Sequence, residues 1–165
     1  MKNIIKKIDE CVFSKDYEKA LHILSNAIFY VENLNEKYDG QLAFLYYYKA
    51  SVLALIEKTE DALQHILKAC ELDSENIKYL VLKSNIYKIL GDKDKALQSY
   101  IRVLEKMPGA IKGNEEVFEN AINYIKELDV NYNNGEFTKE ELFDYLISLY
   151  KTKEQNISEE KFNRG

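Results

Sequence analysis

Three segments of the chain repeat one pattern of apolar residues, and this repeat is the feature that most restricts the possible folds. Each segment has a small alanine, a large apolar residue four positions later and a smaller one three positions after that. The three sets are Ala20, Leu24 and Ala27, then Ala62, Ile66 and Ala69, then Ala96, Tyr100 and Val103. Spacings of three and four residues place such side chains on one helix face. The sequence therefore predicts stacked helical units that bury their apolar faces against one another.

The pattern resembles the tetratricopeptide repeat, whose second helix carries this alanine motif. Ala62 and Ala96 are 34 residues apart, which is the period of that family, whereas Ala20 and Ala62 are 42 apart. We attribute the eight extra residues to a longer second helix in the first repeat and a longer first helix in the second. The first helices also fit, with Ile4, Ile8 and Cys11, then Tyr46, Ala50 and Leu53, then Leu80, Ser84 and Tyr87 at the corresponding positions.

The resemblance implies an all-α fold, a right-handed superhelical stack of antiparallel helix pairs. Three repeats are expected at 1–34, 43–76 and 77–110, and we number the places in each repeat from its first residue. Helices are expected near 3–13, 16–35, 40–56, 60–72, 75–90 and 93–106, with Asp16, Ser74 and Asp92 as N-caps. Residues 111–152 are interpreted as a degenerate fourth repeat or capping hairpin, and 153–165 as a polar tail. The chain departs from the family at place 7, where Lys7, Lys49 and Lys83 replace a leucine.

Composition argues against several classes of partner. The net charge is -5 and arginine occurs only at Arg102 and Arg164, so the chain has no basic face for nucleic acid or for an anionic membrane surface. The first residues are broken by lysines and do not read as a signal peptide. Two cysteines, Cys11 and Cys70, have no metal or disulfide spacing, which favours a cytoplasmic location.

Catalytic motifs are lacking in the sequence. The two histidines, His22 and His65, fall at neighbouring places of two different second helices and are not expected to meet. No nucleophile elbow, phosphate-binding loop or zinc motif occurs. The sequence therefore predicts a binding protein that is not an enzyme and needs no cofactor.

In the tetratricopeptide family the first helices line a groove that binds a protein or peptide, with contacts near places 2, 5, 6, 9, 12 and 13. In the first repeat these places hold Lys2, Ile5, Lys6, Asp9, Val12 and Phe13. The predicted groove residues over all repeats are Phe13, Phe44, Tyr47, Tyr48, Ser51, Lys78, Leu82 and Asn85. The alternative is that another helix covers the tyrosines. Self-association through the same face is a second possibility.

One subfamily clamps a terminal carboxylate with lysine, asparagine and arginine. Those places here hold Ile5, Asp9, Tyr48, Lys78 and Leu82, so only Lys78 agrees and no such clamp is expected.

The segment 129–141 resembles a calcium-binding EF-hand loop, with Gly135, Phe137 and Glu141 at the right mutual spacing. Asp129, Asn131 and Asn133 alternate as ligands would, but only with one residue inserted before the glycine. The other interpretation is a polar turn in which Asn-Asn-Gly supplies left-handed conformations. A calcium-responsive adaptor is thus the third functional hypothesis.

Overall fold

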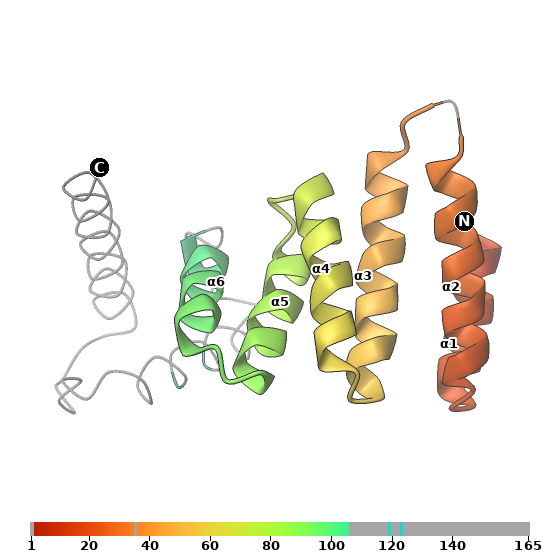
Figure 1. Cartoon of the computed structure of the whole chain (residues 1–165). Helices are drawn as coiled ribbons and strands as arrows, with labels where there is room; N and C mark the ends of the chain where they lie inside the picture. Colours follow the sequence, from red (N-terminus) through yellow and green to blue (C-terminus); the bar gives the residue numbers. More distant parts are fainter. Residues whose placement is uncertain (1, 35, 106–118, 120–122, 124–165) are drawn as a thin grey trace, which may run out of the picture. The chain divides into compact units, whose positions relative to one another are not determined.

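The computed structural model describes residues 2–34 and 36–105, together with 119 and 123. Within these residues the chain is helical and has no strand, which confirms the all-α prediction. The helices are α1 (Lys2–Phe13), α2 (Tyr17–Glu32), α3 (Asp39–Leu55), α4 (Thr59–Leu72), α5 (Ile77–Ile89) and α6 (Lys93–Glu105) (Figure 1). Apart from residues 119 and 123, the proposed hairpin 111–152 lies outside the described residues, as do the tail 153–165 and the loop residues Asp129, Asn131, Asn133 and Glu141.

The chain divides into two compact units, Met1–Asp92 and Lys93–Gly165. The first unit contains α1 to α5 and a continuous core. The second contains α6, on which Ala96, Tyr100 and Val103 of the repeat pattern are all buried.

The N-cap of α2 agrees with the sequence prediction, whereas the N-cap of α5 differs from it. The Asp16 carboxylate accepts a hydrogen bond from the Lys19 backbone N–H at 3.2 Å, as expected of an N-cap. The prediction of Ser74 was wrong, because α5 begins at Ile77 and is capped by Asn76, whose side-chain oxygen accepts from the Lys78 N–H at 3.2 Å. The Asn76 amide also donates to Asp73 at 3.1 Å, which keeps the chain out of the helix until residue 77.

The same tight turn follows α1, α3 and α5. At place 15, Lys15 and Glu57 have φ of 60° and Gly91 has φ of 75°, so each adopts the left-handed conformation. The next backbone N–H then bonds five residues back, from Asp92 to the Tyr87 carbonyl at 3.0 Å for example. Because the turns are alike, equivalent residues of α1, α3 and α5 have equivalent surroundings at these helix ends.

Small residues let the helices of the first unit approach closely. Ala20, Ala50 and Ala62 are completely buried, as are the large side chains Leu24 and Ile66 that follow two of these alanines in the repeat pattern. The most extensive helix pair is α3 with α4, and α3 also touches α5. One core cluster runs from Ile8 on α1 to Ile86 on α5 and joins the five helices.

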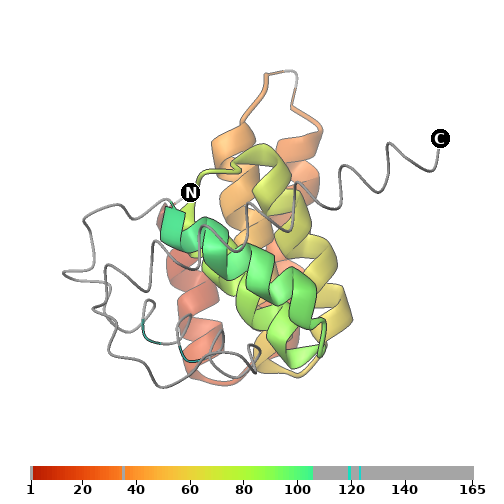
Figure 2. The same ribbon diagram turned by 90° about the vertical axis from the view of Figure 1, so that its left-hand side faces the viewer.

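The extra residues between the first two alanines lie in α2, α3 and their loop. Helix α2 has 16 residues and α4 has 14, while α3 has 17 and α5 has 13. Both helices are therefore longer than their counterparts, as predicted, and the remaining residues lengthen the connection at 33–38. This end of the α2–α3 pair projects past its neighbours (Figure 2). Helix α1, with 12 residues, does not share the extension.

Candidate binding surface

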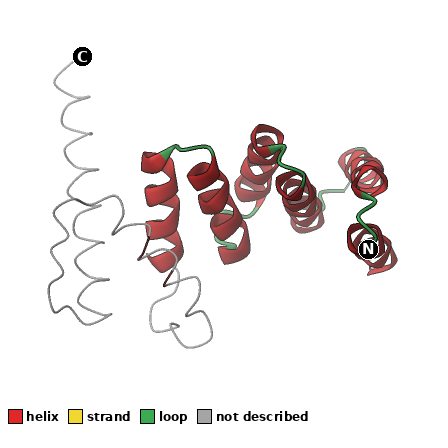
Figure 3. Cartoon of the chain, turned by 90° about the horizontal axis from the view of Figure 1, so that it is seen from below, coloured by secondary structure: helices red, strands yellow, loops and turns green. Residues whose placement is uncertain are grey.

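Helices α1, α3 and α5 lie along one side of the first unit, and α2 and α4 lie along the other (Figure 3). We call the surface of the former the first-helix face. These three helices carry seven lysines and three carboxylates, a net charge of +4. Helices α2 and α4 carry two lysines and five carboxylates, a net charge of −3. The first helices are thus positive within a chain whose total charge is -5.

The three consecutive tyrosines of α3 point in different directions, as their helical spacing requires. Tyr46 is 4% exposed and its hydroxyl donates to the Glu32 carboxylate of α2. The ring of Tyr47 lies 5.0 Å from the ring of Tyr79 on α5. The ring of Tyr48 lies 4.8 Å from that of Phe44, one helical turn away.

These contacts make one aromatic ladder along α3 and onto α5. It consists of Phe44, Tyr48, Tyr47 and Tyr79, with Tyr47 and Tyr48 meeting edge to face at 5.9 Å between ring centroids. Tyr79 is buried, whereas Phe44, Tyr47 and Tyr48 are partly exposed. The ladder therefore joins the core at one end and reaches solvent at the other.

Tyr48 is also close to α1. Burial raises the pKa of its hydroxyl, and the negative charge of Asp9 raises that pKa further. The hydroxyl therefore stays protonated at neutral pH and is available as a hydrogen-bond donor.

A pocket of about 390 Å³ opens between α1 and α3 on this face. Its lining consists of Lys2, Ile5, Lys6, Asp9 and Phe44. All five occupy groove places of the family. The aliphatic and aromatic side chains offer an apolar contact, while the two lysines add positive charge and Asp9 adds one negative charge. Lys6 pairs with Glu10 at 3.9 Å, but both side chains are largely exposed and such a pair is weak.

Place 13 forms a second regular feature. Phe13, Leu55 and Ile89 are 92%, 60% and 67% exposed, although each is a large apolar residue. They end α1, α3 and α5 just before the repeated turn. The same apolar exposure in three successive repeats is unusual for a surface with no partner.

The other predicted residues have varied surroundings. The Ser51 hydroxyl donates to the Tyr47 carbonyl at 2.9 Å and is used within α3. Leu82 is partly buried and packs against the core cluster. Lys78 and Asn85 are exposed on α5. The geometry thus brings Phe44, Tyr47 and Tyr48 together, and leaves Phe13 exposed at the end of α1.

A separate polar cluster surrounds Tyr46 between α2, α3 and α4. The Lys49 ammonium donates to the Ser25 hydroxyl at 3.0 Å, and the Lys68 ammonium lies 5.0 Å from the centre of the Tyr46 ring. The His65 ring stacks on Tyr46 at 5.7 Å. Burial, together with the charges of the two lysines, lowers the pKa of His65 to about 4. His65 is thus a neutral packing residue at physiological pH.

Other kinds of site find no support in the described part of the chain. Its histidines, cysteines and carboxylates form no group that could hold a metal ion. His22, the other histidine, is on the surface and hydrogen-bonded to Asn26 at 3.0 Å. None of the described helices has the length and apolarity that a membrane span needs.

Comparison with known proteins decides the fold. The chain superposes on the TPR2B domain of yeast Sti1 in its pHsp70 complex, with a TM-score of 0.64 over 78% of this chain and 97% of that one, at 14% identity. The fold is that of a tetratricopeptide-repeat (TPR) domain. A TPR domain of Spaghetti (RPAP3) bound to the HSP90 peptide SRMEEVD gives 0.63 over 76% of this chain and 90% of that one, at 18% identity. BtubC from P. vanneervenii gives 0.65 over 91% and 71%, at 17% identity.

No family model and no curated protein matches the sequence. The similarity to TPR structures is therefore one of fold, and the place-by-place assignment of a TPR groove to this chain stays a prediction.

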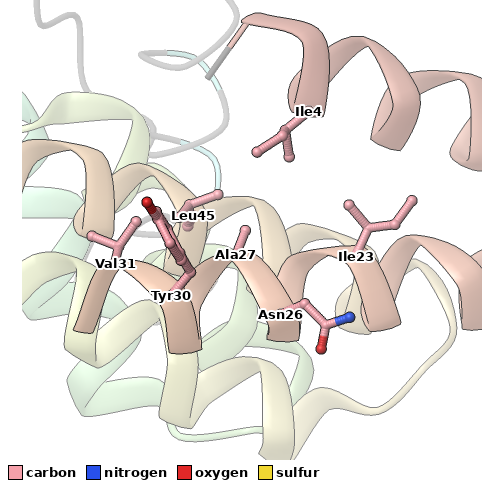
Figure 4. Close-up of a pocket in the computed structure, with 7 residues that line it drawn as sticks. All are labelled: Ile4, Ile23, Asn26, Ala27, Tyr30, Val31 and Leu45. Atoms are coloured by element: carbon pink, nitrogen blue, oxygen red, sulfur yellow. The ribbon is translucent and has the colours of Figure 1, made fainter. Parts of the chain in front are cut away.

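Two features of the surface escaped the sequence analysis. The first is Tyr79, at place 3 of the third TPR-like repeat, which belongs to the aromatic ladder. Because α3 and α5 are neighbours in such a stack, its packing on an α3 tyrosine could have been predicted. The second is an apolar opening of about 330 Å³ between α1 and α2, where Ile4 faces Ile23 and Ala27 (Figure 4).

Proposed function

We propose that the chain is a non-catalytic scaffold that binds a peptide or protein segment on its first-helix face. The observation that carries the proposal is the pocket between α1 and α3, where Ile5 and Phe44 lie beside two exposed lysines. An apolar side chain of the partner fits against the apolar walls, and acidic residues next to it meet Lys2 and Lys6. We therefore expect an acidic segment with an aromatic or aliphatic anchor.

The distribution of charge supports an acidic partner. The first helices have a net charge of +4, opposite in sign to α2 and α4 and to the whole chain. Such a local field raises the rate at which an oppositely charged segment associates, and it opposes docking on the acidic side. Binding should accordingly weaken as ionic strength rises.

The aromatic ladder and the row at place 13 support an extended contact rather than a single pocket. Tyr48 adds a hydroxyl donor beside a partly exposed ring, a combination common at binding surfaces. Phe13, Leu55 and Ile89 add apolar contacts at equivalent positions of three repeats. The TPR domains of similar fold bound to chaperone peptides make peptide binding reasonable for this fold. Because Ile5 and Tyr48 replace residues of the carboxylate clamp, we expect recognition through side chains within the segment.

A peptide-display selection with the whole chain as bait tests the proposal. Random peptides and peptides with blocked C-termini should both give binders that are enriched in Asp and Glu around an aromatic or aliphatic residue. The variant Lys2→Glu/Lys6→Glu should bind these peptides at least about tenfold more weakly, because two exposed attractive charges become repulsive. Titration calorimetry at low and high salt measures the change.

The matched control reverses two exposed lysines elsewhere, Lys19→Glu on α2 and Lys37→Glu in the α2–α3 loop. This variant changes the net charge by the same amount as Lys2→Glu/Lys6→Glu, and its affinity for the peptides should stay within about twofold of wild type. If both variants lost the same amount of peptide affinity, the effect would come from the overall charge of the chain. Selected peptides without acidic enrichment, or with unchanged affinity for Lys2→Glu/Lys6→Glu, would contradict the proposed site.

A further inference from the structure

Asp9 brings the one negative charge into the pocket between α1 and α3. The pocket is lined by Asp9 together with Lys2, Ile5, Lys6 and Phe44. Asp9 is exposed, and no hydrogen bond or ion pair joins its carboxylate to another residue within the described part of the chain. The lysine one helical turn before it, Lys6, pairs instead with Glu10 at 3.9 Å. The charge of Asp9 is therefore available to a ligand.

Two aromatic rings lie next to this carboxylate. Phe44 lines the same pocket, and the centroid of the Tyr48 ring lies 4.8 Å from that of Phe44, with both side chains partly exposed. Burial raises the pKa of Tyr48 and the charge of Asp9 raises it further, so the carboxylate lies within electrostatic reach of the phenol. An ammonium or guanidinium group is attracted both by a carboxylate and by the face of an aromatic ring. This side of the pocket therefore has the composition of a cation site.

The sign of the charge changes along α1 within the pocket. Lys2 and Lys6 come first and Asp9 follows, with Ile5 between the two lysines. At a rise of about 1.5 Å per residue, Asp9 lies about 5 Å beyond Lys6 and about 10 Å beyond Lys2 along the helix axis. An extended segment covers such distances in about two or three residues. A segment that is acidic throughout would place a carboxylate against Asp9, whereas one with a basic residue after its apolar anchor would meet opposite charges at both ends.

Asp9 is the only acidic residue at any groove place of the three repeats. Place 9 holds Ser51 and Asn85 in the second and third repeats, and both are uncharged. The Ser51 hydroxyl is already used within α3, where it donates to the Tyr47 carbonyl at 2.9 Å. The other charged groove places hold lysines, which are Lys2, Lys6, Lys78 and Lys88. A basic residue in an otherwise acidic ligand therefore has one favourable position on the first-helix face, and this position fixes the register of the segment.

We propose that Asp9 selects a basic residue, arginine in preference to lysine, next to the apolar anchor of an otherwise acidic segment. This role of Asp9 rests on the proposed function, since it concerns the same pocket. A guanidinium pairs with the carboxylate through two N–H groups while its flat face packs on the Phe44 and Tyr48 rings, whereas an ammonium has no such face. A segment running the other way brings its acidic residues to Asp9 and its basic residue to the two lysines, so repulsion at both ends excludes it.

The peptide-display selection with the whole chain, repeated with Asp9→Lys and Glu10→Lys as further baits, tests this role. Peptides selected by wild type should carry Arg or Lys on one fixed side of the anchor. Asp9→Lys should lose that preference and select Asp or Glu there instead. Glu10→Lys is the matched control, because it changes the charge of α1 by the same amount outside the pocket lining, and it should keep the wild-type preference. Both positions are exposed, and circular dichroism checks that each variant keeps the fold.

Failure of this role can be told apart from failure of the proposed function. Acidic peptides without a basic residue beside the anchor would overturn the role of Asp9 and leave the proposed function intact. A preference for a basic residue that persists in Asp9→Lys, or that is lost in Glu10→Lys as well, would also overturn it. A wild type that selects no acidic peptides would contradict the proposed function and the role of Asp9 together.

Titration calorimetry with one selected peptide measures the size of the effect. Wild type should bind that peptide about fivefold more tightly than a version with glutamine in place of its basic residue, as expected of an exposed ion pair with a ring contact. Asp9→Asn should bind both peptides with nearly equal affinity, because it removes the charge and keeps the size of the side chain. A peptide of the same composition in reversed order should bind wild type at least about fivefold more weakly. Equal wild-type affinities for the selected peptide and its glutamine version would refute the selection by Asp9.

Discussion

His65 should make the stability of the first unit depend on pH, and the variant His65→Leu isolates its effect. The imidazole stacks on Tyr46 and faces Lys49, Lys68 and Asp61. Its Nδ1 is buried and has no hydrogen-bond partner among the described residues. Burial and the two ammonium groups both oppose a proton on this ring, and they lower its pKa to about 4 from an ordinary value of 6.5.

The sign of the effect follows from the protons bound in each state. Between pH 6.5 and 4 the unfolded chain protonates its histidine and the folded chain does not, so falling pH stabilises the unfolded state relative to the folded one. The contribution of the neutral His65 to stability is fully present above pH 6.5 and decreases toward pH 4. The two pKa values correspond to ~2 kcal/mol at pH 5. Because the ring is only partly buried, solvent screening reduces this to about 1 kcal/mol.

Urea unfolding of both proteins at pH 7.5, 6.5, 5.5 and 5, chosen to span roughly the ordinary pKa of histidine, measures the effect. The difference in unfolding free energy between His65→Leu and wild type should grow by about 1 kcal/mol from the highest to the lowest pH. His22 and all carboxylates are present in both proteins, so their contributions cancel. A difference that is constant with pH would refute the assignment of His65 as a desolvated, neutral histidine.

Three further predictions concern the turns and the core, and all are measured by chemical unfolding followed by circular dichroism. Gly91→Ala should cost about 1 kcal/mol, because φ is 75° there and an added Cβ meets no atom within 4 Å, so only backbone strain acts. The reverse change at the equivalent turn, Lys15→Gly, should be neutral or stabilise by up to about 1 kcal/mol, and a marked loss of stability would contradict the equivalence. Leu24→Ala should cost about 2–5 kcal/mol, since Leu24 is completely buried in the core cluster.

The sequence predicts the helices of this chain well because the information lies in local patterns. Alanines and large apolar residues at helical spacing mark the buried face of each second helix, and Ala20, Ala62 and Ala96 are all completely buried. The chain leaves α1, α3 and α5 through turns in which the residue at place 15 has the same left-handed conformation. The cap of α5 was mispredicted because Ser74 and Asn76 are both good caps, and the choice depends on the Asn76–Asp73 contact.

The candidate surface is less accessible to sequence reasoning because it depends on contacts between helices. Helical spacing alone separates Tyr46 from Tyr47 and Tyr48. It does not reveal that Tyr47 packs on Tyr79, or that Asp9 of α1 is near Tyr48. The apolar opening between Ile4 of α1 and Ile23 of α2 likewise depends on how these helices pack. The predicted groove residues therefore stay a prediction that binding experiments must test.

The lysines at place 7 connect these observations. Lys49 is partly buried beneath α2, where its ammonium donates to Ser25 and its pKa is lowered by burial and by Lys68. A leucine there would fill the same space without bonding to Ser25, so lysine is accommodated because a preceding helix offers a polar partner. Lys7, at the same place of the first repeat, is exposed. The side chain at this place is therefore partly buried in the second repeat, where α2 covers it, and exposed in the first.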